Sequence, residues 1–151
     1  MSLKNFKYAD KIEAGCDEAG RGCLSGPVFA AAVILPKHFR CPELDDSKKL
    51  SEAKRNALRK IIEENAIAFC VADISPLKID EVNILQASIL GMHESLNGLS
   101  TKPNFILVDG NKFNQYQDIE HECIIQGDGK YKSIAAASIL AKTYRDEYMQ
   151  K

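Results

Sequence analysis

The chain has 151 residues, of which 45% are hydrophobic, 27% charged and 7% aromatic. These proportions are typical of a globular domain, and they exclude a collagen-like, coiled-coil or intrinsically disordered chain. Lys and Arg number 20 against 21 Asp and Glu, for a formal net charge of -1, so any nucleic acid would be bound through a local basic patch.

The first half of the chain predicts strands at residues 11–16, 27–35 and 66–74 and a helix at residues 51–65. Residues 27–35 are a continuous apolar run, which is typical of a strand covered on both faces of a sheet. Ser51 is a good helix N-cap, with an acidic residue directly after it in the first turn. Between these elements, residues 37–50 mix proline with charges and are predicted to be a loop.

The second half predicts a long helical region, a pair of short strands and a final helix. Ser75 and Pro76 indicate a helix start, and one apolar stripe continues from there to about Gly98. The strands are predicted at residues 104–108 and 122–125, and the last helix at residues 131–150.

The cellular compartment and the state of the cysteines can be predicted from three features that the sequence lacks: a membrane-spanning apolar run, a signal-peptide core and a Cys-x-x-Cys pair. The longest apolar run, residues 28–35, is too short to span a bilayer, and residues 1–15 carry charges where a signal peptide has an apolar core. The cysteines are odd in number and form no Cys-x-x-Cys pair, which argues against a disulfide framework or a structural zinc site. We therefore expect a cytoplasmic protein with reduced thiols and no membrane association.

Acidic residues stand where the predicted strands end. Asp17 and Glu18 end the first strand, Asp109 ends the fourth, and Asp128 follows the fifth. Each Asp-Gly pair, taken singly, is also an ordinary turn sequence. If the strands share one sheet, however, their ends bring the four carboxylates together, which turn chemistry does not explain.

Such a cluster needs a counter-ion, because two carboxylates about 4 Å apart repel by about 4 kcal/mol at an effective dielectric of about 20. An oxygen-only ligand set suits Mg²⁺ or Mn²⁺ and argues against Zn²⁺. Two such ions can activate a water and stabilise the leaving oxygen of a phosphodiester. Phosphodiester hydrolysis is the chemistry that these acids fit best.

A glycine-rich turn, Gly20-Arg21-Gly22, follows the first acidic pair. It matches neither the phosphate loop Gly-x-x-x-x-Gly-Lys-Ser/Thr nor the dinucleotide fingerprint. The glycines would let the backbone approach a bulky ligand, with Arg21 available for a phosphate. A simple tight turn is the alternative interpretation.

With these residues in view, the sequence resembles the ribonuclease HII family in four blocks that occur in the family's order. The blocks are residues 15–28 (GCDEAGRGCLSGPV), residues 46–50 (DSKKL), residues 107–110 (LVDG), and residues 127–146, which run from Gly-Asp through SIAAASILAK to Arg-Asp. The resemblance implies an α/β, ribonuclease-H-like fold with a mixed five-stranded sheet flanked by helices.

The resemblance also implies an activity and a set of roles. The activity is endonucleolytic hydrolysis of RNA in RNA–DNA hybrids and cleavage 5′ of ribonucleotides embedded in duplex DNA, with Mg or Mn, leaving 5′-phosphate and 3′-hydroxyl ends. Asp17, Glu18, Asp109 and Asp128 would be the catalytic acids and metal ligands. Gly20, Arg21 and Gly22 would contact the ribose 2′-hydroxyl, the group that distinguishes RNA from DNA.

Basic residues elsewhere in the blocks are further candidates for substrate binding. Ser47, Lys48 and Lys49 could hold phosphates from their loop, although a lysine pair before a helix is also ordinary solvated surface. Lys142 and Arg145 on the last helix could face the duplex, with an ordinary exposed face as the alternative. Asp146 by the family pattern supports the helix and is not a ligand.

As to domain organisation, we expect residues 1–151 to form a single ribonuclease-H-like domain that is C-terminally truncated relative to the family and acts as a monomer. The family's further C-terminal residues carry an active-site tyrosine, which neither Tyr144 nor Tyr148 matches in position. A duplex-binding module without turnover, and a nuclease of the same fold that acts on DNA, are the competing functions.

Overall fold

The computed structural model describes residues 2–22 and 25–151, and within them five strands form one mixed sheet. The strands are β1 (Glu13–Ala19), β2 (Val28–Ile34), β3 (Ala68–Ile74), β4 (Phe105–Asp109) and β5 (Glu120–Ile124). Their order is β3-β2-β1-β4-β5, with β1, β2 and β3 antiparallel and β4 and β5 parallel to β1. The predicted mixed sheet is therefore confirmed.

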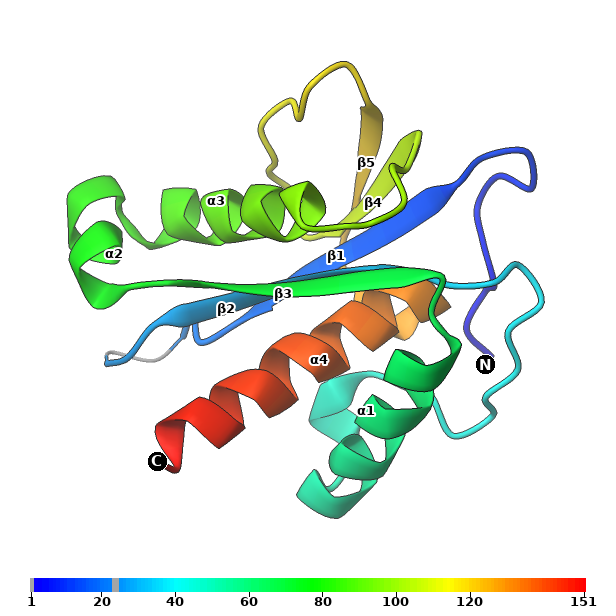
Figure 1. Cartoon of the computed structure of the whole chain (residues 1–151), viewed down its shortest axis with the longest axis horizontal. Helices are drawn as coiled ribbons and strands as arrows, with labels where there is room; N and C mark the ends of the chain where they lie inside the picture. The colour runs from blue at the N-terminus through cyan, green and yellow to red at the C-terminus, as the bar shows by residue number, and fades with distance from the viewer. Residues whose placement is uncertain (1, 23–24) are drawn as a thin grey trace.

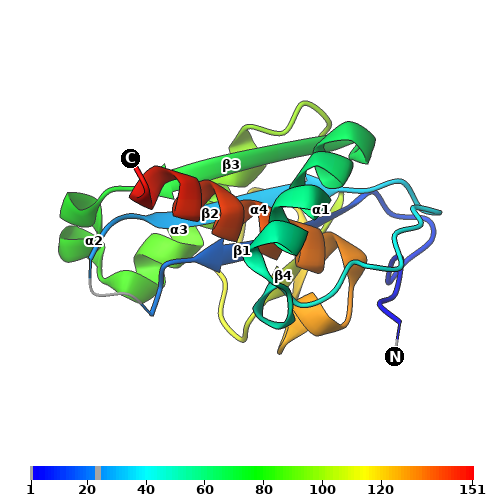
Figure 2. The same ribbon diagram turned by 90° about the horizontal axis from the view of Figure 1, so that it is seen from below.

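Helices cover both faces of the sheet (Figure 1). They are α1 (Glu52–Asn65), α2 (Pro76–Val82), α3 (Ile84–Asn97) and α4 (Lys132–Met149), with short 3₁₀ turns η1 (Ser47–Lys49) and η2 (Gly127–Gly129). Helices α2 and α3 lie on one face, and α1 and α4 lie in front of the other in Figure 2. Because both faces are covered, every residue of β2 is buried, which explains its apolar sequence.

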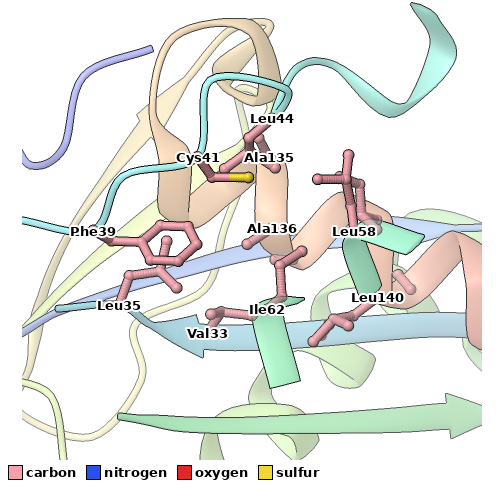
Figure 3. Packing of buried hydrophobic residues seen from close by; sticks show 14 of the residues in the cluster. Val33, Leu35, Phe39, Cys41, Leu44, Leu58, Ile62, Ala135, Ala136 and Leu140 are labelled. Carbon is pink, nitrogen blue, oxygen red and sulfur yellow. The ribbon is translucent and has the colours of Figure 1, made fainter. Parts of the chain in front are cut away.

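The largest buried hydrophobic cluster among the described residues lies between the sheet and helices α1 and α4 (Figure 3). Leu58 and Ile62 of α1 meet Val33 of β2 and Leu140 of α4, and all of these side chains are fully buried. Full burial of one such side chain contributes roughly 1.5–3 kcal/mol.

Helix α4 packs unusually close to β1. Its residues Ala135, Ala136 and Ala137 are fully buried, and a Cβ added at Gly15 would lie 2.3 Å from the backbone carbon of Ser133. A larger residue at either surface would push the helix away. The small residues therefore fix α4 along the strand that carries the first acidic pair.

The helical region after Ser75 differs from the sequence prediction, because it is two helices and not one. Asn83 separates α2 from α3 with a φ of 75°, a conformation that a helix interior does not permit. Its side chain accepts a hydrogen bond from the backbone N–H of Gln86 and so caps α3. The apolar stripe continues across the break, so periodicity alone did not show it.

Strand and loop boundaries differ by smaller amounts. The first strand extends to Ala19, so Asp17 and Glu18 lie inside it and not after it. The predicted loop of residues 37–50 contains η1, whose cap is the side chain of Asp46. In the described part of the chain, no helix has the length and apolar character that a membrane crossing requires. The described cysteines have free thiols, and Cys23 lies outside the described residues.

Candidate active site

Acidic side chains from separate elements meet at the edge of β1 and β4. Among the described residues, Asp17, Asp109 and Asp128 each offer an oxygen within 4.8 Å of the others. The parallel register pairs Cys16 with Val108, which places Asp17 beside Asp109, and η2 brings Asp128 to the same point. The predicted convergence therefore occurs for three of the four acids.

Glu18 lies beside this cluster and not within it. Successive side chains of a strand point to opposite faces, but the Glu18 carboxylate still lies near enough to Asp17 for its charge to raise the Asp17 pKa. It also lies 3.7 Å from the guanidinium of Arg21 and lines the same pocket as the cluster. It is placed to contribute from the rim.

Backbone groups hold two of the cluster's carboxylates in place. Asp109 Oδ1 accepts a hydrogen bond of 2.7 Å from the backbone N–H of Gly127, and Asp17 Oδ1 accepts one of 2.8 Å from that of Glu18. A Cβ at Gly127 would lie 2.6 Å from Ile134 Cδ1, so a larger residue there would make the Ile134 side chain shift. The contact joins η2, which carries Asp128, to the end of β4.

The electrostatics of the cluster favour a bound cation. Burial raises the pKa of Asp17 well above its usual range, and the charges of Glu18 and Asp109 raise it further. Burial and the charge of Asp109 raise the pKa of Asp128 to about 6. Lys48 Nζ, 3.2 Å from Asp128 Oδ2, only partly offsets these effects. The all-oxygen donor set and the excess negative charge fit a hard divalent cation.

Ten of the residues that the sequence predicts as site residues line one open pocket of about 270 Å³. They are Asp17, Glu18, Gly20, Arg21, Gly22, Ser47, Lys48, Asp109, Asp128 and Lys142, and Ala19 and Ser138 complete the lining. The side chains of Arg21, Lys48 and Lys142 are 48%, 76% and 42% exposed, so cations surround the buried acids. This arrangement suits a phosphodiester whose reacting phosphate lies over the acids.

One of the expected substrate contacts needs correction, and another residue has a structural contact as well. Ser47 is buried, and its hydroxyl is 2.7 Å from that of Ser138, so it fixes η1 to α4 within the lining of the pocket. Arg145 does not face outward, because it is only 6% exposed and donates to the carbonyls of Ser25 and Pro27. Both acceptors are more than a hundred residues away in the sequence, so the helical pattern around Arg145 did not show that its side chain would be buried.

The sequence reasoning missed the contacts around η1. Asp46 Oδ1 lies 3.4 Å from Lys48 Nζ and accepts from the backbone N–H of Lys48, and Ser138 anchors the same turn. Asp46 stands in the second block of the resemblance, where an acidic residue before Ser-Lys was the available signal.

The fold and the site together define a class. A mixed sheet of this strand order with acids at the junction of β1, β4 and η2 is that of a ribonuclease-H-like, metal-dependent nuclease. A family model described as ribonuclease HII matches residues 14–151. The chain belongs to the ribonuclease HII family.

Individual relatives agree with this assignment. The chain is 62% identical over 149 residues to the ribonuclease HII of Bacteroides thetaiotaomicron, an alignment that covers 99% of this chain and 74% of that protein. The crystal structure of ribonuclease H2 from Pyrococcus horikoshii superposes with a TM-score of 0.78 at 27% identity and covers 91% of this chain and 74% of that one. Ribonuclease HII of Archaeoglobus fulgidus, solved in a complex with PCNA, gives a TM-score of 0.76 at 27% identity, covering 91% and 73%.

Proposed function

We propose that this protein is a divalent-metal-dependent endoribonuclease. It hydrolyses RNA in RNA–DNA hybrids and cuts 5′ of ribonucleotides embedded in duplex DNA, leaving 5′-phosphate and 3′-hydroxyl ends. The observation that carries the proposal is the buried acid cluster, which lies in one pocket with the Gly-Arg-Gly turn and three exposed cations. Membership of the ribonuclease HII family supports it.

Asp17, Asp109 and Asp128 are the residues that would hold the cation, with Glu18 at the rim. Oxygen ligands of this kind suit Mg²⁺ or Mn²⁺. When bound, the cation activates the attacking water and stabilises negative charge on the leaving oxygen. The protein's own part is to hold the carboxylates in a fixed geometry through β1, β4 and the Gly127 hydrogen bond.

The turn of Gly20, Arg21 and Gly22 would recognise the ribose. Gly20 has a φ of 95°, which an L side chain rarely adopts, and a Cβ there would lie 2.2 Å from Arg145 Nε. Gly22 has open space around it, so a ligand can approach its backbone closely. The exposed backbone groups of such a turn can form hydrogen bonds with a ribose 2′-hydroxyl, which DNA lacks.

Lys48 and Lys142 would contact phosphates on either side of the acids. Lys48 extends from η1 to Asp128, and Lys142 extends from α4, where Asp146 lies 3.1 Å from its ammonium. Both ammonium groups are solvent-accessible point charges, which is how lysine binds phosphate.

The test is cleavage of a labelled DNA duplex that carries one ribonucleotide, with Mg²⁺, Mn²⁺ or EDTA, beside an RNA–DNA hybrid and an all-DNA duplex. We expect metal-dependent cutting 5′ of the ribonucleotide and none of the all-DNA duplex. Asp109→Asn is the matched variant, because its amide oxygen can still accept from Gly127 while the charge is lost. Full activity of this variant refutes the assignment.

The same experiment separates the competing functions. A chain that binds the duplex in Ca²⁺ but does not cut it after transfer to Mg²⁺ or Mn²⁺ is a binding module. A chain that cuts the all-DNA duplex equally well is a DNA nuclease. We propose that the active form is a single ribonuclease-H-like domain that acts as a monomer in the cytoplasm. Light scattering with and without duplex tests its oligomeric state.

A further inference from the structure

Arg55 of α1 reaches out of its own helix to the η1 turn. Its Nη1 donates to the backbone carbonyls of Ser47, at 3.2 Å, and Leu50, at 2.6 Å. Its Nη2 lies 3.8 Å from Asp146 Oδ2 on α4. The side chain is 15% exposed, and its guanidinium joins α1, η1 and α4.

These contacts fix the backbone that carries Lys48. The carbonyls held by Arg55 lie on either side of Lys48, and the Lys48 N–H is held by Asp46 at 2.9 Å. The hydroxyl contact between Ser47 and Ser138 adds a tie to α4. Because the side chain of Lys48 is 76% exposed, few neighbours restrain it. The position of its backbone therefore determines which positions the ammonium group can occupy.

Stability alone does not account for this guanidinium. Its Nε is buried without a hydrogen-bond partner among the described residues, which is unfavourable. The pair with Asp146 is long, and taking its charges out of water offsets much of their attraction. An apolar side chain of the same length would fill the space without these penalties, but it could not hold the carbonyls of η1.

Arg59 provides an internal comparison one turn further along α1. It is 19% exposed, pairs with Glu63 and Glu147, and stacks on the ring of Tyr144 at 3.7 Å. Its contacts therefore join α1 to α4, as those of Arg55 do, but none of them touches η1 or the active-site pocket.

We propose that Arg55 is a positioning residue that aims Lys48 at a substrate phosphate, acting through the carbonyls of Ser47 and Leu50. This inference rests on the proposed function, because it presupposes that Lys48 binds the duplex. It assigns to Arg55 no contact with the substrate, since Arg55 does not line the pocket and its Nη1 donates to η1.

The experiment measures the dissociation constant for a ribonucleotide-containing duplex by fluorescence anisotropy, in constant Ca²⁺ and a series of KCl concentrations. Each lost phosphate contact lowers the slope of log K against log salt by about 0.9, which corresponds to about eightfold weaker binding at about 0.1 M salt relative to a 1 M reference. We expect this loss of slope in Lys48→Met and in Arg55→Met. The double variant should lose the same amount as either single variant, because both substitutions remove the same phosphate contact. Arg59→Met removes the same charge from the same helix and leaves the slope unchanged.

Three results overturn the inference. One is an unchanged slope in Arg55→Met, and another is a double variant that loses about twice as much, about 1.8, because Arg55 would then bind the duplex itself. The third is an unchanged slope in Lys48→Met, because Lys48 would then bind no phosphate and Arg55 could not act by positioning it.

Cleavage by the unmodified protein shows in each case whether the proposed function stands. If circular dichroism shows Arg55→Met to be unfolded, Arg55→Lys, which keeps the charge but lacks the planar fork, must show the same loss.

Discussion

Replacing Asp128 with asparagine is expected to stabilise the metal-free protein at pH 8 and to change its stability little at pH 4. Burial raises the pKa of Asp128 to about 6, whereas an unfolded aspartate titrates at about 3.9. Between these values the unfolded chain releases a proton that the folded chain keeps, so stability falls as pH rises. The two pKa values differ by about 2 units, so above pH 6 the ionised Asp128 lowers the free energy of unfolding by about 3 kcal/mol.

The pKa of about 6 already includes the attraction of Lys48, whose ammonium lies 3.2 Å from Asp128 Oδ2, so no further amount is subtracted for losing it. We therefore expect Asp128→Asn to be about 3 kcal/mol more stable at pH 8, which raises the midpoint of thermal unfolding by roughly 6–12 °C for a chain of this size. At pH 4 the gain falls to about 0.5 kcal/mol, because the folded carboxyl group is protonated and the unfolded one is about half ionised.

Circular dichroism melts of the two proteins from pH 4 to pH 8 in EDTA measure this difference. Asp118→Asn, at an exposed position outside the pocket, is the control for losing one negative charge. Saturating Mg²⁺ or Mn²⁺ should then reverse the order, since a ligand at a thousand times its dissociation constant stabilises the unmodified protein by about 4.1 kcal/mol. The reasoning is refuted if Asp128→Asn is no more stable at pH 8, or if the gain is equally large at pH 4.

Three other predictions concern single residues. Gly15→Ala places a methyl group 2.3 Å from the backbone of α4 and should lower the free energy of unfolding in urea by about 3 kcal/mol; an unchanged value would contradict the close packing. Asn83→Ala loses the cap of α3 while keeping a φ of 75°, so we expect a loss of about 2 kcal/mol, and less for Asn83→Gly. Gly20→Ala, crowded by Arg145, should lose preference for the ribonucleotide-containing duplex while stabilisation by Mg²⁺ persists; retained preference would exclude the turn as the ribose reader.

The sheet and the acid cluster could be predicted from the sequence because both depend on local signals. An apolar run such as that of β2 indicates burial on both faces, and an aspartate at the end of a run, such as Asp109, lies at the sheet edge. Two details differ from the prediction: Asp17 and Glu18 lie inside β1 and not after it, and Glu18 stands at the rim of the group formed by Asp17, Asp109 and Asp128. Pairing of β1 with β4 brings Asp17 to the site, and no local pattern specifies that pairing.

The contacts that support the site could not be predicted in the same way, because their partners are distant in the sequence. Arg145 and Asp146 are neighbours on α4, yet Arg145 holds backbone carbonyls beside the glycine-rich turn, whereas Asp146 pairs with Arg55 of α1. A helical period shows which residues share a face, but not which backbone carbonyl lies opposite them.

Close packing and polar support of the site therefore depend on one another. The alanines of α4 and Gly15 of β1 let the helix approach the sheet, and only at that distance can Arg145 reach Pro27 and Ser138 reach Ser47. A larger residue in this contact would lengthen all of these hydrogen bonds together. It would thus loosen both segments that flank the acids without altering a single acidic side chain, so loss of activity in such a variant would report the position of α4 and not the chemistry of the cluster.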